Sequence, residues 1–322
     1  MPDSVEAATS AQSRDNIPWH SGEIAVQEAA GVRAVIEARG RSLIRDHLIR
    51  QHRDFFPLLP YVVIGTVDAS ASAWATMREG PQGFLSVADD KTLYVAAGPD
   101  PADPAESSLS KGTAIGLLGI QLGTRRRNRL NGLISHRDPN GFAVTVDESF
   151  GNCPQHIRLR SHEFVREPSL RSARVEEGTT LREQDRRLVE AADTFFVATY
   201  SDHDGKRRVD VSHRGGQSGF VRVDSDGSLT IPDFPGNMFF NTLGNIFANR
   251  RAGLLFPKFE DGSLLQLTGS AEVILGSSEV RFFPGAERLW RFFPERMVFR
   301  ASALALRWTP VGDWTQQPAP FD

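Results

Sequence analysis

The segment "TRRRNRLNG" (124–132) contains the residues of this sequence that are best suited to hold an anion. Four arginines and one asparagine occupy positions 125–129, directly after the apolar run "AIGLLGIQLG". In a strand, Arg125, Arg127 and Arg129 would share one face, because side chains alternate along a strand. Arginines on one face repel each other unless an anion or carboxylates lie between them. The segment therefore predicts an anion pocket or, as the alternative, a surface ladder of arginines paired with local Asp and Glu.

The usual motifs of catalysis and of metal binding do not occur in the sequence. There is no G-x-x-x-x-G-K-[ST], no G-x-G-x-x-G after a strand, no H-E-x-x-H and no paired C-x-x-C. The eight histidines are scattered, and Cys153 is more typical of a small buried residue than of a nucleophile. No catalytic residue and no metal site are predicted, so any chemistry is expected to come from a bound cofactor.

The composition is that of a globular protein of two ordinary domains. The chain has 322 residues, a net charge of −3 and a single cysteine, which excludes an intrachain disulfide and fits a reducing compartment. A basic stretch in a slightly acidic chain favours a local anion site over a nucleic-acid surface. Residues 1–18 lack the apolar core of a secretory signal, and no apolar run could span a bilayer. We therefore expect a cytoplasmic protein with neither a nucleic-acid nor a membrane partner.

Hydrophobic periodicity divides the chain into helical and strand-rich parts. Helical spacing extends through residues 19–57, whereas short strand candidates between Gly, Pro and Asp turns begin at Tyr61. The polar segment 166–180 is expected to link two units, with a helix at "LREQDRRLVEAAD" directly after it and another at "NTLGNIFAN" (241–249). The expected divisions are an N-terminal extension and helix at 1–54, a first barrel at 55–165, a linker and helix at 166–190, and a second barrel with a C-terminal extension at 191–322.

The two strand-rich parts repeat each other. An offset of 136 pairs Gly83–Phe84 with Gly219–Phe220, and an offset of 137 pairs Gly116–Leu118 with Gly253–Leu255. The pattern predicts a duplicated domain rich in antiparallel strands, in which the two copies form the equivalent of a covalent homodimer. We expect the copies, at about 55–165 and 190–280, to pack through the strands that carry Thr76 and Ser212. We also expect a homodimer of the whole chain as a further partner interaction.

One strand of each copy carries a hydroxyl residue and, two positions later, an arginine. In "RRVDVSHR" (207–214), the valines are expected to fill a barrel while Ser212 and Arg214 face outward. Trp74, Thr76 and Arg78 take this outward face in the first copy. Each strand is followed by a Gly-rich turn whose N–H groups can join an arginine in holding an anion. A solvated sheet face is the alternative interpretation.

The order of these segments resembles the flavin-nucleotide-binding proteins related to pyridoxamine 5′-phosphate oxidase, in the subgroup with two fused split β-barrels. The motifs that carry the resemblance are "WHSGEIAVQEAAGV", "GLLGIQLGTRRRNRLNG", "FGNCPQHI", "VDVSHRGGQSGFVRV", "IPDFPGNMFFNTLGNI" and "RAGLLFP". It covers about Trp19 to Phe299. The resemblance implies a mainly β fold with flanking helices, made of tandem split barrels, and FMN bound in the groove between them.

The resemblance also implies which residues contact the flavin. Carried over position by position, these are Ser212, Arg214, Ile231, Pro232, Asn241, Thr242 and, in the first copy, Arg127. The oxidases have an Arg-Lys pair for the phosphate where Asn241 and Thr242 stand here. The positive charge is therefore expected from Arg214 or from the cluster Arg125, Arg127 and Arg129. Trp74, Thr76 and Arg78 complete the candidate set, with Trp74 as a neighbour of the isoalloxazine ring.

These observations favour an FMN-dependent oxidoreductase related to pyridoxamine 5′-phosphate oxidase that acts on a small molecule or exchanges electrons with a donor protein. The C-terminal "RWTPVGDWTQQPAPFD" has no clear equivalent of the oxidase's substrate region, which argues against pyridoxamine phosphate itself. The alternative is a non-catalytic module that stores or senses a flavin, a deazaflavin or haem.

Overall fold

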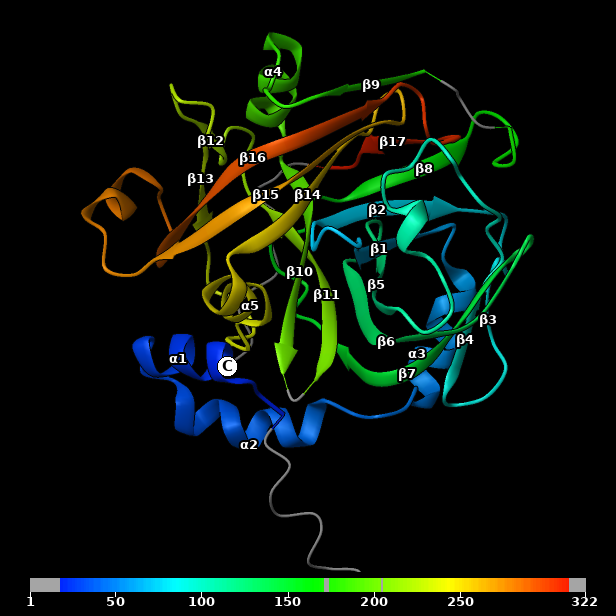
Figure 1. Cartoon of the computed structure of the whole chain (residues 1–322), viewed down its shortest axis with the longest axis horizontal. Coiled ribbons are helices and arrows are strands. Elements are labelled where there is room, and N and C mark those ends of the chain that lie inside the picture. Colours follow the sequence, from blue (N-terminus) through cyan, green and yellow to red (C-terminus); the bar gives the residue numbers. More distant parts are fainter. Residues whose placement is uncertain (1–17, 171–173, 204, 313–322) are drawn as a thin grey trace, which may run out of the picture.

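The computed structural model describes residues 18–170, 174–203 and 205–312, and two antiparallel sheets form its framework (Figure 1). In sheet order, the first consists of β2 (Ala73–Glu79), β1 (Tyr61–Val67), β5 (Ala114–Gln121), β6 (Arg126–Asp138), β7 (Gly141–Gly151), β4 (Thr92–Val95) and β3 (Leu85–Val87). The second consists of β11 (Lys206–Gly215), β10 (Thr194–His203), β14 (Arg251–Lys258), β15 (Ser263–Ile274), β16 (Arg288–Arg300), β13 (Leu229–Asp233) and β12 (Arg222–Val223). It therefore extends past the expected end at 280.

The two sheets are copies of one design. Their strands follow the same order, and the pairing of Val63 with Leu118 in the first recurs as Phe196 with Leu255 in the second. Both also carry a β-bulge at the same place, directly before Gly132 in β6 and directly before Gly269 in β15. A shared irregularity of this kind is a designed feature rather than a defect. The predicted duplication and the tandem split-barrel fold are thus confirmed.

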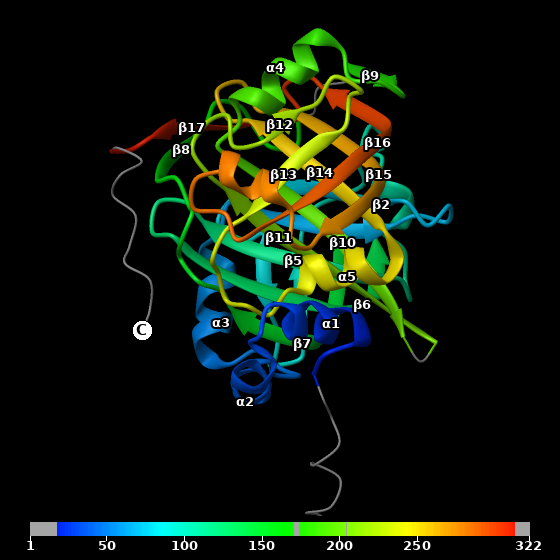
Figure 2. The ribbon, with the colours of Figure 1, turned by 90° about the vertical axis from the view of Figure 1, so that its left-hand side faces the viewer.

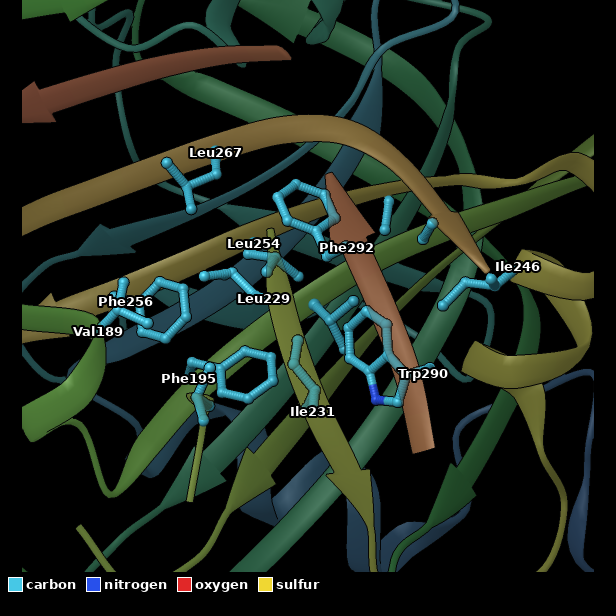
Figure 3. Packing of buried hydrophobic residues seen from close by; sticks show 14 of the residues in the cluster. Val189, Phe195, Leu229, Ile231, Ile246, Leu254, Phe256, Leu267, Trp290 and Phe292 are labelled. Carbon is cyan, nitrogen blue, oxygen red and sulfur yellow. The ribbon is translucent and has the colours of Figure 1, made fainter. Parts of the chain in front are cut away.

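Each sheet curls around a hydrophobic core of its own. Figure 3 shows the core of the second sheet, where Phe195, Leu254 and Trp290 from three different strands meet in one cluster. The first sheet encloses a corresponding cluster that includes Ile64, Leu117 and Phe142. All six side chains are fully or almost fully buried. Burial of this apolar surface supplies the main driving force for folding of each copy.

A third apolar cluster lies between the two sheets. It joins Val63 and Ala75 of the first copy to Phe196 and Val211 of the second, so β2 and β11 lie at the contact as expected. The backbones approach closely there, because a Cβ on Gly253 would overlap the Ala73 carbonyl oxygen. The expectation that the valines of β11 fill a barrel is wrong. Val211 packs between the sheets instead.

Helices cover one end of the second sheet and flank both copies. The helical pattern of residues 19–57 is divided into α1 (Ser21–Ala29), α2 (Arg33–Leu43), α3 (Arg50–Phe55) and a short 3₁₀ turn, η1 (Phe56–Leu58). It is interrupted at Gly31, whose φ of 71° ends α1. The expected helices α4 (Glu183–Ala191) and α5 (Asn241–Asn249) are confirmed. In Figure 2, α1 lies directly below α5.

The remaining elements are short. The segment expected as a linker includes β9 (Val175–Gly178), which pairs with the edge of β16, so part of it belongs to the second sheet. β8 (Arg160–Phe164) and β17 (Leu306–Pro310) form a two-stranded ribbon. Two further 3₁₀ turns are η2 (Glu106–Ser108) and η3 (Ser278–Phe282).

Candidate functional site

A pocket lies at the junction of the two copies, where β6 of the first meets β11 of the second. The loop after β13 and the start of α5 complete its wall. Its enclosed volume is about 100 Å³, enough for a phosphate-sized group and several waters. The polar side chains at its wall include Arg127, Arg129, Asn152, Ser212, His213, Arg214, Asp233, Asn241, Thr242 and Arg288. We refer to this site as the cationic pocket.

Arg127 is a cation in the pocket without an acidic partner. Its Nε donates to the Cys153 carbonyl oxygen at 2.7 Å, and its Nη1 lies 3.2 Å from His213 Nδ1. Within the described part of the chain, no carboxylate lies within ion-pair distance of its guanidinium. Desolvation by burial, together with the nearby Arg129 and Arg214, lowers the pKa of Arg127 to about 10. A partly buried charge without a counter-ion would be stabilised by an anion from outside the chain.

Arg129 differs because its charge is balanced. Its Nη1 donates to Asp210 Oδ1 and to Asn241 Oδ1, both at 3.0 Å, and its Nη2 donates to Ser212 Oγ. The guanidinium also lies 5.2 Å from the ring centre of Phe150. Arg129 is therefore a fixed part of the wall that joins β6, β11 and α5.

Two further arginines of the pocket share one carboxylate. Arg214 Nη1 and Arg288 Nη1 donate to the two oxygens of Asp233 at 2.6 and 2.7 Å, and Arg288 also donates to Glu287 at 2.9 Å. Arg288 stacks on Phe240, with its Cζ 4.6 Å from the ring centre. Asp233 thereby holds two guanidinium groups at the pocket wall.

Several buried donors of the pocket have no partner among the described residues. They include the Nε atoms of Arg129 and Arg214 and the Nε2 atom of His213. Burial, followed by the charge of Arg127, holds the pKa of His213 well below its usual value, so its imidazole is neutral. Because its Nδ1 accepts from Arg127, the ring proton is assigned to the unpartnered Nε2. The pocket is thus rich in donors that an oxyanion could accept from.

The loop that closes the pocket has an uncommon backbone. Met238 and Phe240 have φ values of 60° and 61°, in the left-handed region that side-chain-bearing residues rarely adopt. His156, on the facing segment, has a φ of 61° as well. Such conformations persist only where the surroundings impose them, and they cluster at functional sites. Phe240 is also the residue from which α5 begins.

The motif "WHSGE" positions α5 and, through it, the pocket. Glu23 accepts from Asn241 Nδ2 at 2.5 Å, and His20 Nε2 lies 2.8 Å from Asn245 Oδ1. The helices cross so closely that a Cβ on Gly22 would overlap the Gly244 carbonyl oxygen. Burial and the nearby Asp210 raise the pKa of Glu23 well above its usual range, which favours a protonated carboxyl. The sequence analysis assigned Asn241 to the site but not His20, Glu23 or Asn245.

The structure brings seven of the twelve candidate residues to the cationic pocket. They are Arg127, Arg129, Ser212, Arg214, Pro232, Asn241 and Thr242. Ile231 lies beside them in the sequence but is fully buried in the core of the second sheet. Arg125 precedes β6, has a φ of 57° and donates to the Ile157 carbonyl oxygen, so the strand face predicted for it is wrong.

Trp74, Thr76 and Arg78 do not face outward and lie away from this pocket. All three are at least 97% buried, and Thr76 and Arg78 bind the Asp103 carboxylate. The indole Nε1 of Trp74 donates to Asp68 at 3.0 Å. The outward-facing prediction also fails for Ser212. This residue pairs with Val197 of the second core, and its hydroxyl accepts from Thr242 Oγ1 at 3.1 Å below α5.

Residues that sequence reasoning missed include His156, His213, Asp233 and Arg288. Asp233 directly follows the implied contacts Ile231 and Pro232, and His213 lies between Ser212 and Arg214, so adjacency to them was an available signal. Arg288 had no such signal, because it lies 55 residues after Asp233 in the sequence and reaches the pocket on β16. The described residues hold no group of three or more His, Cys, Asp or Glu side chains suited to a metal ion. In the same residues, no helix has both the length and the hydropathy needed to cross a membrane.

No protein-family model and no curated protein matches the chain. Among solved structures, it is similar to HupZ of Group A Streptococcus, with 15% identity, a TM-score of 0.29 and coverage of 41% of this chain and 100% of that one. A Lactobacillus delbrueckii protein named for pyridoxamine 5′-phosphate oxidase has 18% identity, a TM-score of 0.25 and coverage of 33% and 95%. The FAD binding protein from Mycobacterium smegmatis has 12% identity, a TM-score of 0.25 and coverage of 39% and 98%. The solved structures that this chain resembles include proteins named for pyridoxamine 5′-phosphate oxidase and flavin-binding proteins. Each of them matches a third to two fifths of the length of this chain.

Proposed function

We propose that the chain binds FMN, with the phosphate in the cationic pocket, and that it acts as a flavin-dependent oxidoreductase. The observation that carries the binding proposal is Arg127, a partly buried guanidinium without an acidic partner among the described residues. An FMN phosphate carries roughly two negative charges at neutral pH, and arginine is suited to such a group.

The donor set fits a phosphate ester. Arg127 would supply the charge, while the unpartnered Nε of Arg214 and Nε2 of His213 are available as further donors. The enclosed volume of about 100 Å³ admits the phosphate but not a whole flavin nucleotide. A more apolar groove of about 700 Å³ adjoins the pocket and shares His156, Phe220 and Phe234 with it. The remainder of the ligand would extend along this groove.

A bound flavin would supply hydride and electron transfer. The chain's own contribution would be to fix the phosphate with Arg127, to hold the walls together through Arg129 and Asp233, and to keep a neutral imidazole at His213. The reaction partner is proposed to be a small molecule or an electron-donor protein. The single cysteine favours a reducing compartment such as the cytoplasm.

The binding proposal is tested by fluorescence titration of the purified chain, freed of ligand, with FMN, riboflavin, FAD and a deazaflavin cofactor. We expect FMN to bind more tightly than riboflavin, and its affinity to fall with salt. Arg127→Ala should weaken FMN binding roughly ten- to a hundred-fold, because a hydrogen bond to a charged group contributes about 1.5–3 kcal/mol. The matched control is Arg126→Ala, since Arg126 is exposed and stacks on Phe55, 4.6 Å from its ring centre. An Arg127→Ala protein that folds and binds FMN as tightly as the parent would refute the proposal.

A second experiment separates catalysis from storage. The FMN-loaded chain is mixed anaerobically with NADH or NADPH, the flavin absorbance is followed, and oxygen is then admitted. Bleaching followed by recovery over repeated cycles is expected of an oxidoreductase. Stable binding without bleaching, with either nucleotide and with small electron donors, would instead favour the non-catalytic module.

A further inference from the structure

The junction of β2 with β15 is the counterpart of the cationic pocket in the duplicated fold, and we refer to it as the groove between β2 and β15. β2 occupies the place in the first sheet that β11 has in the second, and β15 corresponds to β6. Thr76 and Arg78 therefore stand where Ser212 and Arg214 stand in the pocket. At the positions of Arg127 and Arg129, the counterpart carries Leu264 and Gln266. Of these four positions, two therefore keep the same kind of side chain, a hydroxyl and an arginine.

A carboxylate of the chain itself fills this groove. Asp103, from the loop between β4 and β5, accepts hydrogen bonds from Thr76 Oγ1 and Arg78 Nη1. Gln266 Nε2 donates to its other oxygen at 3.1 Å, and Arg300 Nη1 lies 3.2 Å from Oδ2. The side chain of Asp103 is fully buried. Four side chains from three strands therefore converge on one carboxylate.

Both cations of this groove are paired with carboxylates of the chain itself. Arg78 also pairs with Glu106 at 2.9 Å, and Arg300 also pairs with Asp100. Burial alone would raise the pKa of Asp103, but Arg78 and Arg300 outweigh it, and the pKa lies below its usual value. Asp103 is therefore ionised and acts as the anion of the groove. Arg127 in the cationic pocket has no such partner among the described residues.

We propose that the groove between β2 and β15 is a closed oxyanion site, in which the Asp103 carboxylate takes the place that a ligand's anionic group would occupy. The site would accept a small carboxylate or phosphate once the Asp103 side chain is removed. A consequence, which rests on the proposed function, is that the chain binds one flavin phosphate rather than the two that a duplicated fold could hold.

The closed site is tested by replacing Asp103 and supplying an anion in solution. Asp103→Ala should unfold at a lower temperature than the parent, because it leaves Arg78 and Arg300 short of a buried partner. Formate or acetate should raise its midpoint by at least about 3 °C over chloride at equal ionic strength, since a ligand of the folded state stabilises it. The parent should not respond in this way.

Two controls separate anion binding from a general salt effect. Asp103→Asn keeps the space filled, so formate should not stabilise it. Asp261→Ala removes a partly exposed carboxylate that pairs with Lys258, so formate should not affect it either. If Asp103→Ala is unfolded in chloride, recovery of folded protein in formate supports the proposal. Failure of formate and acetate to stabilise or refold Asp103→Ala would overturn it.

The stoichiometry of the unmodified chain provides an independent measurement. Equilibrium dialysis at saturating FMN should give one flavin per chain, whereas two per chain would contradict a closed second site. If no flavin binds at all, the proposed function fails, and the formate experiment still decides whether Asp103 occupies an oxyanion site.

Discussion

The Arg129 guanidinium of the first copy and the Asp210 carboxylate of the second form an ion pair across the junction of the two sheets, with Nη1 3.0 Å from Oδ1. Their side chains are only 5% and 9% exposed. Removing one partner leaves the other charge buried and unbalanced, so Arg129→Met should lower the free energy of unfolding by about 3–5 kcal/mol. Urea unfolding would measure this loss. Arg207→Met, which breaks the exposed pair with Asp202, should cost about 1 kcal/mol or less.

Removal of the Arg127 guanidinium should not lower the free energy of unfolding of the ligand-free chain, in contrast to removal of Arg129. The Arg127 guanidinium is desolvated and lies near Arg129 and Arg214, which lowers its pKa to about 10. Arg127→Met should therefore leave the stability of the ligand-free chain unchanged or raise it, even though FMN binding weakens. Thermal unfolding with and without FMN would show both effects. A loss of several kcal/mol without ligand would identify Arg127 as a structural residue instead.

The glycines at the contact between the sheets should not tolerate a side chain. A Cβ on Gly116 would lie 2.7 Å from the Val209 carbonyl oxygen, and one on Gly253 would overlap that of Ala73. Because backbone cannot move aside as a flexible side chain can, Gly253→Ala should cost about 3 kcal/mol or more. Gly151→Ala is the control, since its nearest neighbour would be at 3.6 Å. Equal urea midpoints for the two variants would contradict this close contact.

His52 should contribute to loss of stability in acid. Burial, followed by Arg45 and Arg126, lowers its pKa from 6.5 to about 4, and its Nδ1 lies 2.7 Å from Ser149 Oγ. Because the unfolded state takes up the proton first, the free energy of unfolding should fall as pH drops from about 6.5 towards 4. His52→Gln should lose less stability than the parent between about pH 7 and pH 5. The exposed His136→Gln should lose as much as the parent.

Much of the fold could be predicted because local patterns determine it. Alternating apolar residues marked most strands, and the two offsets between copies predicted equivalent positions such as Gly116 and Gly253, which the strand pairings confirm. The helical pattern of residues 19–57 could not show which of its apolar positions are buried. Val35 and Leu43 fit the helical spacing, but both are exposed. Helical periodicity reports a possible face, whereas only tertiary packing determines whether that face is covered.

The candidate site could be predicted only in part, for a related reason. Ser212 and Arg214 were identified by the same pattern as Thr76 and Arg78, yet only the first pair reaches the pocket. The difference comes from the topology, because β2 meets β15 at the other junction of the copies. There Asp103 binds Thr76 and Arg78, and the loop that brings it to β2 leaves no local signal in the sequence. Arg125 was misplaced because the turn before β6 ends one residue later than the alternation suggested.

The cationic pocket takes β6 from one copy and β11 from the other, and this division frees the two copies to diverge. In a symmetric dimer of separate chains, every substitution appears at both junctions at once, so an aspartate that closes one would close its twin. Joining the copies in one chain removes that constraint. Arg127 could persist at one junction while Asp103 occupied the other, because a substitution in one copy no longer changes the second copy.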